Sequence, residues 1–201
     1  MVSCRERRRN ILKNPILPGF NPDPCICKVG DDYYMAVSTF EWMPGIPVYL
    51  HSSGFDASML HDDDGRKWIV SLDWETRAGY EKPGAICLVE YSPEKKEIIG
   101  YPKRIWHGGT DRGCIEAPHL YKRNGYYYIM CAEGGTGYGS YIENELGEVY
   151  LVHLTSRPFV PELRCTLGRE TAMQKMKWTE DGWLRMADGS NLAKEYFEPS
   201  N

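Results

Sequence analysis

The chain has 201 residues, 42% of them hydrophobic and 12% aromatic, which is enough for one compact domain with a sizeable core. Its formal net charge of −4 argues against nucleic acid as a partner, and no apolar stretch is long enough for a signal peptide or a membrane-spanning helix. We therefore expect a cytoplasmic protein that binds neither nucleic acid nor membrane.

The first thirteen residues contain a cluster of basic side chains at positions 5–9, interrupted by Glu6. A mixed cluster of this kind ahead of the first strand is more typical of a solvated segment than of a phosphate-binding arm. Residues 1–13 are therefore predicted to form a disordered basic tail.

Seven cysteines are present, an odd number without the spacing of a disulfide framework. Most stand in apolar strand contexts, which favours buried free thiols in a reducing compartment. Cys25 and Cys27 alternate across a strand, so their thiols point to opposite faces and make a poor metal pair. A metal site of Cys114, His119 and Cys131 is a less favoured alternative, and we expect neither a metal nor another cofactor.

From residue 23 onwards the chain repeats one plan, in which an acidic residue opens a short strand that is followed by a tight turn and an aromatic strand. The three copies begin at Asp23, Asp56 and Glu116, and a fourth has Tyr138 in place of the acid. The turns fall at residues 30–32, 63–65, 124–125 and 146–148, with aromatic or β-branched runs behind them. The acidic run 62–65 lacks the ligand spacing of a calcium loop, so we interpret it as a hairpin turn.

Each copy therefore predicts the two inner strands of a small antiparallel sheet. Repeated sheets with turn signals at short intervals and almost no helical periodicity indicate an all-β fold, the β-propeller, whose blades surround a central channel. The innermost strands line this channel. We thus expect Asp23, Asp56 and Glu116 to stand at the same place in each copy and to converge.

Three converging carboxylates resist ionising together, which separates their pKa values and costs folding free energy unless the site uses both an acid and a base. Glycoside hydrolysis has this requirement, because one protonated carboxyl donates to the leaving oxygen while an ionised one activates water or attacks carbon. The structural alternative is that each acid caps a turn at the start of a strand.

Several motifs resemble the β-xylosidases of glycoside hydrolase family 43. They occupy residues 14–24 (NPILPGFNPDP), 38–42 (STFEW), 54–67 (GFD and HDDDGRK), 116–122 (EAPHLYK), 132–136 (AEGGT) and 167–172 (LGRETA). The resemblance runs from about residue 14 to residue 183. It implies a five-bladed propeller and inverting hydrolysis of xylosides and arabinosides.

The resemblance also implies roles for individual residues. Asp23 would be the general base that activates water, Glu116 the general acid, and Asp56 the third carboxylate, which raises the pKa of Glu116 and orients it. Arg169 would contact the sugar at the cleavage site, with a structural ion pair as the alternative. Phe40 would form an aromatic wall of that pocket, and Trp42 is a further candidate for substrate binding, although aromatic side chains in strands more often belong to the core.

The spacing of the acids departs from a complete propeller. The 60 positions from Asp56 to Glu116 have room for four strands, near residues 58–61, 67–74, 84–91 and 97–106. Only 33 positions separate Asp23 from Asp56, and 22 separate Glu116 from Tyr138, whereas a four-stranded blade needs about 40 to 50. Two blades are therefore expected to be shortened.

Compared with the family pattern, sizeable blocks are missing near residues 49–51 and 138–140. The first block would carry a tryptophan of the pocket, and the second a histidine of a Gly-His-Gly-Ser motif. We also expect no C-terminal β-sandwich of the kind common in these enzymes. We expect a truncated propeller over residues 14–187 and a C-terminal tail over residues 188–201.

The resulting functional expectation is an inverting glycosidase that acts on xylosides or xylo-oligosaccharides, with α-L-arabinofuranosides as another possible substrate. A short oligosaccharide is the expected partner, and the sequence does not indicate an oligomeric state. The alternatives are a sugar-binding relic that kept its carboxylates but lost walls of the pocket, and a fragment without independent function.

Overall fold

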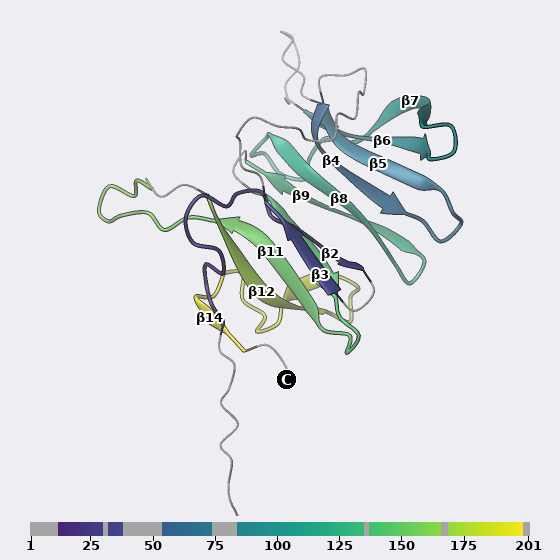
Figure 1. The fold of residues 1–201 in the computed structure, drawn as a ribbon. Helices are drawn as coiled ribbons and strands as arrows, with labels where there is room; N and C mark the ends of the chain where they lie inside the picture. The colour runs from purple at the N-terminus through teal and green to yellow at the C-terminus, as the bar shows by residue number, and fades with distance from the viewer. Residues whose placement is uncertain are drawn as a thin grey trace, which may run out of the picture. The chain divides into compact units, whose positions relative to one another are not determined.

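The computed structural model describes residues 12–29, 32–37, 54–73, 84–134, 137–165 and 169–198. Every regular element among them is a β-strand (Figure 1). These residues contain no helix of the length and apolarity needed to cross a membrane. The chain divides into two compact units, one made of Met1–Thr39 with Ser140–Asn201 and the other of Phe40–Gly139.

The unit of Phe40–Gly139 contains one complete four-stranded antiparallel sheet. Its strands follow chain order and are β4 (Gly54–His61), β5 (Lys67–Asp73), β6 (Ala85–Ser92) and β7 (Glu97–Trp106). This confirms the predicted blade between Asp56 and Glu116. The turn between β4 and β5 closes where Gly65, at φ 88°, donates its N–H to the carbonyl of Asp62, so the acidic run forms the predicted hairpin turn.

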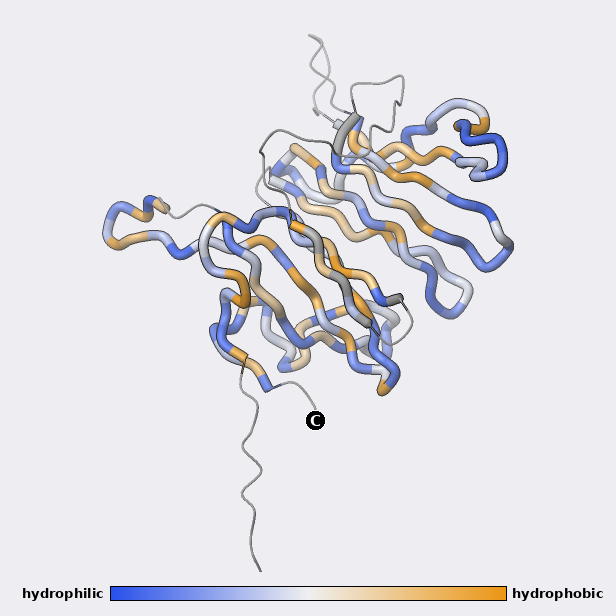
Figure 2. Tube along the Cα trace, in the orientation of Figure 1, coloured by the Kyte–Doolittle hydropathy of each residue, from blue (hydrophilic) through white to orange (hydrophobic). Residues whose placement is uncertain are grey.

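The centre of this sheet supplies the core of the unit. Val70 of β5 and Ile86 of β6 are fully buried and pack with Ile115, which is also buried. Hydrophobic residues run along the middle of β5 and β6 while the turns are hydrophilic (Figure 2). Strands that are apolar on both faces have to be covered on both sides, which is the environment of a strand inside a blade.

The second sheet of this unit has two strands among the described residues, β8 (Ile115–Arg123) and β9 (Tyr126–Glu133). Asn124 and Gly125 join them with φ values of 49° and 79°, as a two-residue type I′ turn requires. The buried carboxylate of Asp62 accepts hydrogen bonds from Lys122 Nζ and Tyr127 Oη at 2.5 Å each, and these two bonds hold the pKa of Asp62 at about 2. They attach the β8–β9 hairpin to the turn before β5.

The other unit combines a two-stranded and a four-stranded sheet. The first has β2 (Cys25–Val29) and β3 (Asp32–Ala36), and the second has β10 (Gly139–Glu143), β11 (Val149–Thr155), β12 (Glu170–Trp178) and β13 (Leu184–Met186). The copy that opens at Tyr138 thus continues into a complete blade. Ser140 Oγ of β10 accepts the N–H of Ile26 in β2 at 2.8 Å, which ties the two sheets together.

Residues 188–198 are not the tail that we expected. They contribute β14 (Tyr196–Phe197), which pairs antiparallel with β1 (Leu12–Lys13). The side chain of Asn14 donates to the carbonyls of Met173 and Lys194 at 2.7 and 2.8 Å, so both ends of the described chain are fastened to β12. The predicted boundary at residue 188 is therefore wrong, because these long-range contacts have no local sequence signal.

The all-β prediction is confirmed, and the fold is that of an incomplete propeller. In the described residues β2–β3 and β8–β9 are two-stranded sheets beside two complete ones, as the short spacings predict. No cysteine in the described residues belongs to a disulfide bond.

Candidate active site

Asp23 lies two residues before β2 in a left-handed backbone conformation, with a φ of 55°. Aspartate tolerates this conformation better than most residues because its short side chain bonds locally. The flanking Pro22 and Pro24 are fully buried, whereas the side chain of Asp23 keeps 16% of its surface exposed. Burial raises the pKa of Asp23, and the charge of Arg169 partly offsets this rise.

Arg169 donates from Nη2 to Asp23 Oδ1 at 2.6 Å. The residues around this pair are hydrogen-bonded to one another, because Asn21 donates its N–H to the carbonyl of Arg169 at 2.8 Å and Thr171 Oγ1 donates to the carbonyl of Asn21 at 2.6 Å. The segment before β2 and the start of β12 therefore hold Asp23 and Arg169 together.

Glu170 stabilises the backbone around the Asp23–Arg169 pair, and the sequence analysis did not identify this residue. Its side chain is 0% exposed, accepts two hydrogen bonds from Arg157 at 2.7 and 2.8 Å, and accepts the N–H of Gly19 at 2.9 Å. Arg157 holds the pKa of Glu170 below its ordinary value. A fully satisfied buried carboxylate next to Arg169 fixes the backbone from which Arg169 projects.

Asp56 and Glu116 meet within the other unit. Asp56 Oδ2 accepts the N–H of Ala117 at 3.1 Å, which is the amide of the peptide bond that Glu116 forms. Ser58 Oγ donates to the carbonyl of Pro118 at 2.7 Å. Both contacts link a bulge in β4 to a bulge in β8. The pairing register shifts between Phe55 and Ser58 in β4 and between Glu116 and His119 in β8.

The bulges correct one part of the repeat argument. The left-handed residue of each copy is Asp23, Asp56 and Ala117, with φ values of 55°, 55° and 54°. Glu116 stands one position earlier, so the prediction that all three acids occupy the same place is wrong for Glu116. The proline that follows both Asp23 and Ala117 is a signal that could have revealed the offset.

The six predicted site residues fall into three groups. Asp23 and Arg169 form an ion pair in one unit, and Asp56 contacts the Glu116 peptide in the other. The convergence of the three carboxylates stays a prediction. Phe40 and Trp42 lie outside the described residues.

His119 is a second residue whose role the sequence did not indicate. It is 6% exposed, and burial lowers its pKa to about 4, so the imidazole is neutral at pH 7. Its ring packs edge-on against Tyr138 with centroids 5.5 Å apart, and its Nε2 has no hydrogen-bond partner within the described part of the chain. Tyr138, which replaces the fourth acid, thus has a packing role beside β8.

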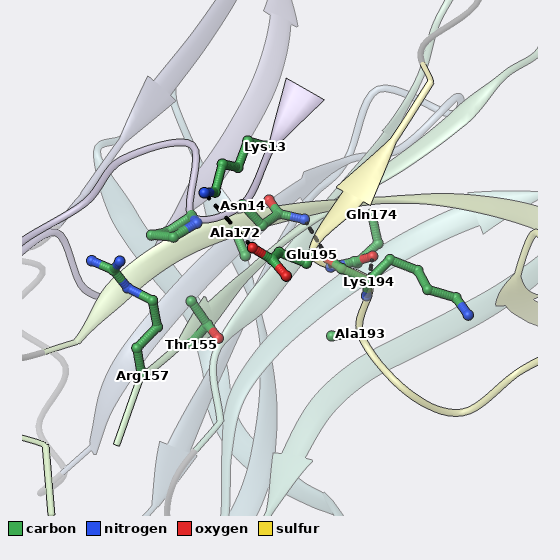
Figure 3. A pocket seen from close by; sticks show the side chains of 10 residues that line it. Lys13, Asn14, Thr155, Arg157, Ala172, Gln174, Ala193, Lys194 and Glu195 are labelled. Carbon is green, nitrogen blue, oxygen red and sulfur yellow. Dashed lines mark hydrogen bonds and ion pairs between the residues drawn. The ribbon is translucent and has the colours of Figure 1, made fainter. Parts of the chain in front are cut away.

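The unit that holds Asp23 also has a hollow of about 400 Å³ (Figure 3). None of the predicted site residues lines it. Its charged lining residues already pair within the chain, since Arg157 binds Glu170, Lys194 binds Asp188 at 2.6 Å and Lys13 lies 3.7 Å from Glu195. We therefore do not interpret this hollow as the active site.

The described part of the chain holds no group of three or more His, Cys, Asp or Glu side chains that could bind a metal ion. The groups available for acid–base chemistry are the carboxylates at the starts of strands in the repeated antiparallel sheets. The fold and these side chains define a β-propeller with aspartate and glutamate side chains at the starts of its inner strands.

Comparison with known proteins names the family. The model for glycosyl hydrolases family 43 matches residues 12–53 and 47–144, and the chain belongs to this family. It is 32% identical to "Xylosidase/arabinosidase 43B" of Humicola insolens and 30% identical to "Beta-xylosidase" of Bacillus subtilis, with 89% and 94% of this chain covered. The crystal structure of a xylan beta-1,4-xylosidase from Bacillus halodurans matches 94% of the chain at 33% identity with a TM-score of 0.79.

The chain spans only part of these relatives, namely 55% and 59% of the two curated proteins and 61% of the Bacillus halodurans chain. The Humicola alignment extends over 298 positions, more than the 201 residues of this chain, so the relative has internal segments without a counterpart here. The family model matches in two pieces that meet at residues 47–53. A block missing near residues 49–51, as predicted, would produce this break.

Proposed function

We propose that this chain hydrolyses xylosides with inversion, using Asp23 as the general base and Glu116 as the general acid. The observation that carries the proposal is the environment of Asp23. Burial disfavours its ionised form while Arg169, bonded at 2.6 Å, keeps the carboxylate oriented and favours ionisation. A base that accepts a proton from water needs this balance between ionisation and basicity.

Asp56 is the positioning residue for the acid. Its carboxylate is bonded to the Ala117 amide, so a negative charge lies next to the backbone of Glu116. A neighbouring negative charge disfavours ionisation of a second carboxyl, which favours the protonated Glu116 that acid catalysis requires.

The substrate class rests on the relatives. Two of them are described as a xylosidase/arabinosidase and a beta-xylosidase. Both descriptions fit a short xylo-oligosaccharide, and the first also fits a terminal arabinofuranoside. The absence of a metal requirement follows the family chemistry, because two carboxyl groups suffice for inversion. We further propose a cytoplasmic site of action on imported oligosaccharides.

The test is hydrolysis of xylobiose, whose sugar leaving group needs a proton as it departs, with 4-nitrophenyl β-xyloside and 4-nitrophenyl α-L-arabinofuranoside as further substrates. We expect Glu116→Gln and Asp23→Asn each to lower the turnover of xylobiose on the order of 10²–10⁴-fold. Glu97→Gln serves as the matched control, because this exposed glutamate lies on β7 away from the bulges. Proton NMR of the first-formed xylose should show the α anomer from a β-xyloside.

Each other outcome has a clear meaning. Turnover by Glu116→Gln equal to that of the parent chain, or a first-formed β anomer, would refute the proposed mechanism. The missing internal segments favour one alternative, the sugar-binding relic. Xylobiose binding by calorimetry without any turnover would establish that alternative instead.

A further inference from the structure

The outer edge of β9 is built like an interior strand. Its residues 126–131 read YYYIMC and contain no charge, no proline and no glycine. In the complete sheets the second strands, β5 and β11, have no exposed residue. At the same place in its own sheet, β9 leaves Tyr126 71%, Tyr127 52% and Ile129 36% exposed.

The chain leaves no local room for further strands on this edge, because β9 ends at Glu133 and β10 begins at Gly139. The backbone groups that face outward follow from the hairpin. In a two-residue type I′ hairpin the residues flanking the turn, Arg123 and Tyr126, form a hydrogen-bonded pair, and such pairs then alternate along the ladder. The N–H and C=O groups of Tyr127 and Ile129 therefore point away from β8.

The outermost strands of the two complete sheets are protected. The outermost strand β7 contains Gly100, Pro102, Lys103 and Arg104, and its pairing with β6 shifts register twice. The outermost strand β13 has only three residues. Charges, proline, bulges and shortness are the devices that keep sheet edges from pairing with other chains. The edge at residues 126–131 has no charge and no proline, it is six residues long, and the one register shift of its pairing with β8 lies at its far end, opposite Cys131.

We propose that this edge, the β9 edge, pairs antiparallel with the β9 edge of a second copy of the chain. Two copies related by a two-fold axis would form the sheet β8–β9–β9–β8, which has the four strands of the complete blades. An uncharged edge meets itself without like-charge repulsion, which favours self-pairing over pairing with a charged strand. The inference does not depend on the proposed hydrolysis.

The expected strength is low. Pairing two six-residue edges buries roughly several hundred Å², less than the ~1,200–2,000 Å² of stable protein–protein interfaces. We therefore expect a monomer–dimer equilibrium that shifts over the micromolar range. With Ile129 at the two-fold axis, the two copies of this residue would form a hydrogen-bonded pair with Cα atoms about 5.5 Å apart, within reach of a disulfide.

The test is sedimentation velocity of the full chain from low micromolar to several hundred micromolar concentration. Ile129→Pro removes only an outward N–H and leaves the ladder to β8 intact, so it should abolish the dimer with an unchanged far-ultraviolet circular dichroism spectrum. Ile129→Lys should do the same if the proline variant unfolds. Ile99→Lys is the matched control, an isoleucine 45% exposed on the protected strand β7, and should leave dimerisation unchanged.

A position-specific readout accompanies it. Ile129→Cys should yield, on mild oxidation, a cross-linked dimer whose disulfide joins the two substituted positions in peptide mass spectra. A chain that stays monomeric at every concentration would overturn the proposal. So would a dimer that persists in folded Ile129→Lys, or open-ended growth to large assemblies without a dimer.

Discussion

Replacing Asp56 separates its structural contribution from its electrostatic one. The residue has two structural tasks, since it adopts a φ of 55° in the β4 bulge and accepts the Ala117 N–H at 3.1 Å. Asp56→Ala removes both the acceptor and the tolerance for a left-handed backbone. Asp56→Asn keeps one acceptor oxygen and that tolerance, while it removes the charge and replaces the other oxygen by an NH₂ group.

The expected magnitudes differ accordingly. Loss of a hydrogen bond to a charged group costs about 1.5–3 kcal/mol, and an alanine in the left-handed region adds about 1 kcal/mol. Asp56→Ala should therefore lower the free energy of unfolding by about 2.5–4 kcal/mol, and Asp56→Asn by less than about 1 kcal/mol. Ser58→Ala, which removes the neutral bond to Pro118, should cost about 1 kcal/mol.

Urea denaturation combined with hydrogen exchange of β4 and β8 peptides measures these changes in the unit that contains them. Equal destabilisation by Asp56→Asn and Asp56→Ala would refute the geometric explanation, because the acceptor and the backbone tolerance would then contribute nothing. A loss below about 1 kcal/mol in Asp56→Ala would do so too.

Activity adds an electrostatic readout of the same variants. The proposed mechanism predicts that the alkaline limb of the pH–activity profile of Asp56→Asn moves to lower pH, because the proposed acid Glu116 would then have no negative charge of Asp56 beside its backbone. An unshifted profile would argue that Asp56 acts on the position of Glu116 alone.

Three further predictions concern burial and charge. Between pH 6.5 and 4 the imidazole of His119 binds a proton in the unfolded chain but stays neutral in the folded one. The free energy of unfolding should therefore fall by about 3 kcal/mol as the pH drops through this range. Urea denaturation of His119→Phe should show a pH dependence that is smaller by this amount. Arg169→Met removes the charge that lowers the pKa of Asp23, so the acid limb of the activity profile should move to higher pH, whereas Arg169→Lys should move it less. Ile86→Ala in the core should cost about 3–4 kcal/mol in urea unfolding against less than about 1 kcal/mol for Ile99→Ala on the surface, and equal losses would contradict the described core.

Local signals made much of the fold predictable. The pair Asn124-Gly125 and the run 62–65 predicted their turns because positive φ favours Asn, Asp and Gly, and apolar runs such as β5 predicted buried strands. The four strands from β4 to β7 follow from these two signals, and their predicted limits agree with the structure within a few residues.

Long-range contacts and bulges were harder to predict. The one-residue offset of Glu116 arises from a bulge, and alternation along a strand does not reveal where an extra residue enters. The docking of residues 188–198 depends on Asn14, which lies far away in the sequence. The pairing of Arg169 with Asp23 likewise joins opposite ends of the chain, so the motif indicated a functional arginine but not its partner.

The division of the chain has a consequence for its biosynthesis. The unit of Phe40–Gly139 is contiguous and interrupts the other unit, whose β2–β3 hairpin is translated well before β10–β14. During translation the inserted unit can thus fold before β10–β14, with which the β2–β3 hairpin forms one unit, have been synthesised. During that interval chaperone capture should concentrate on β2 and β3, and slowing translation after Gly139 should prolong it.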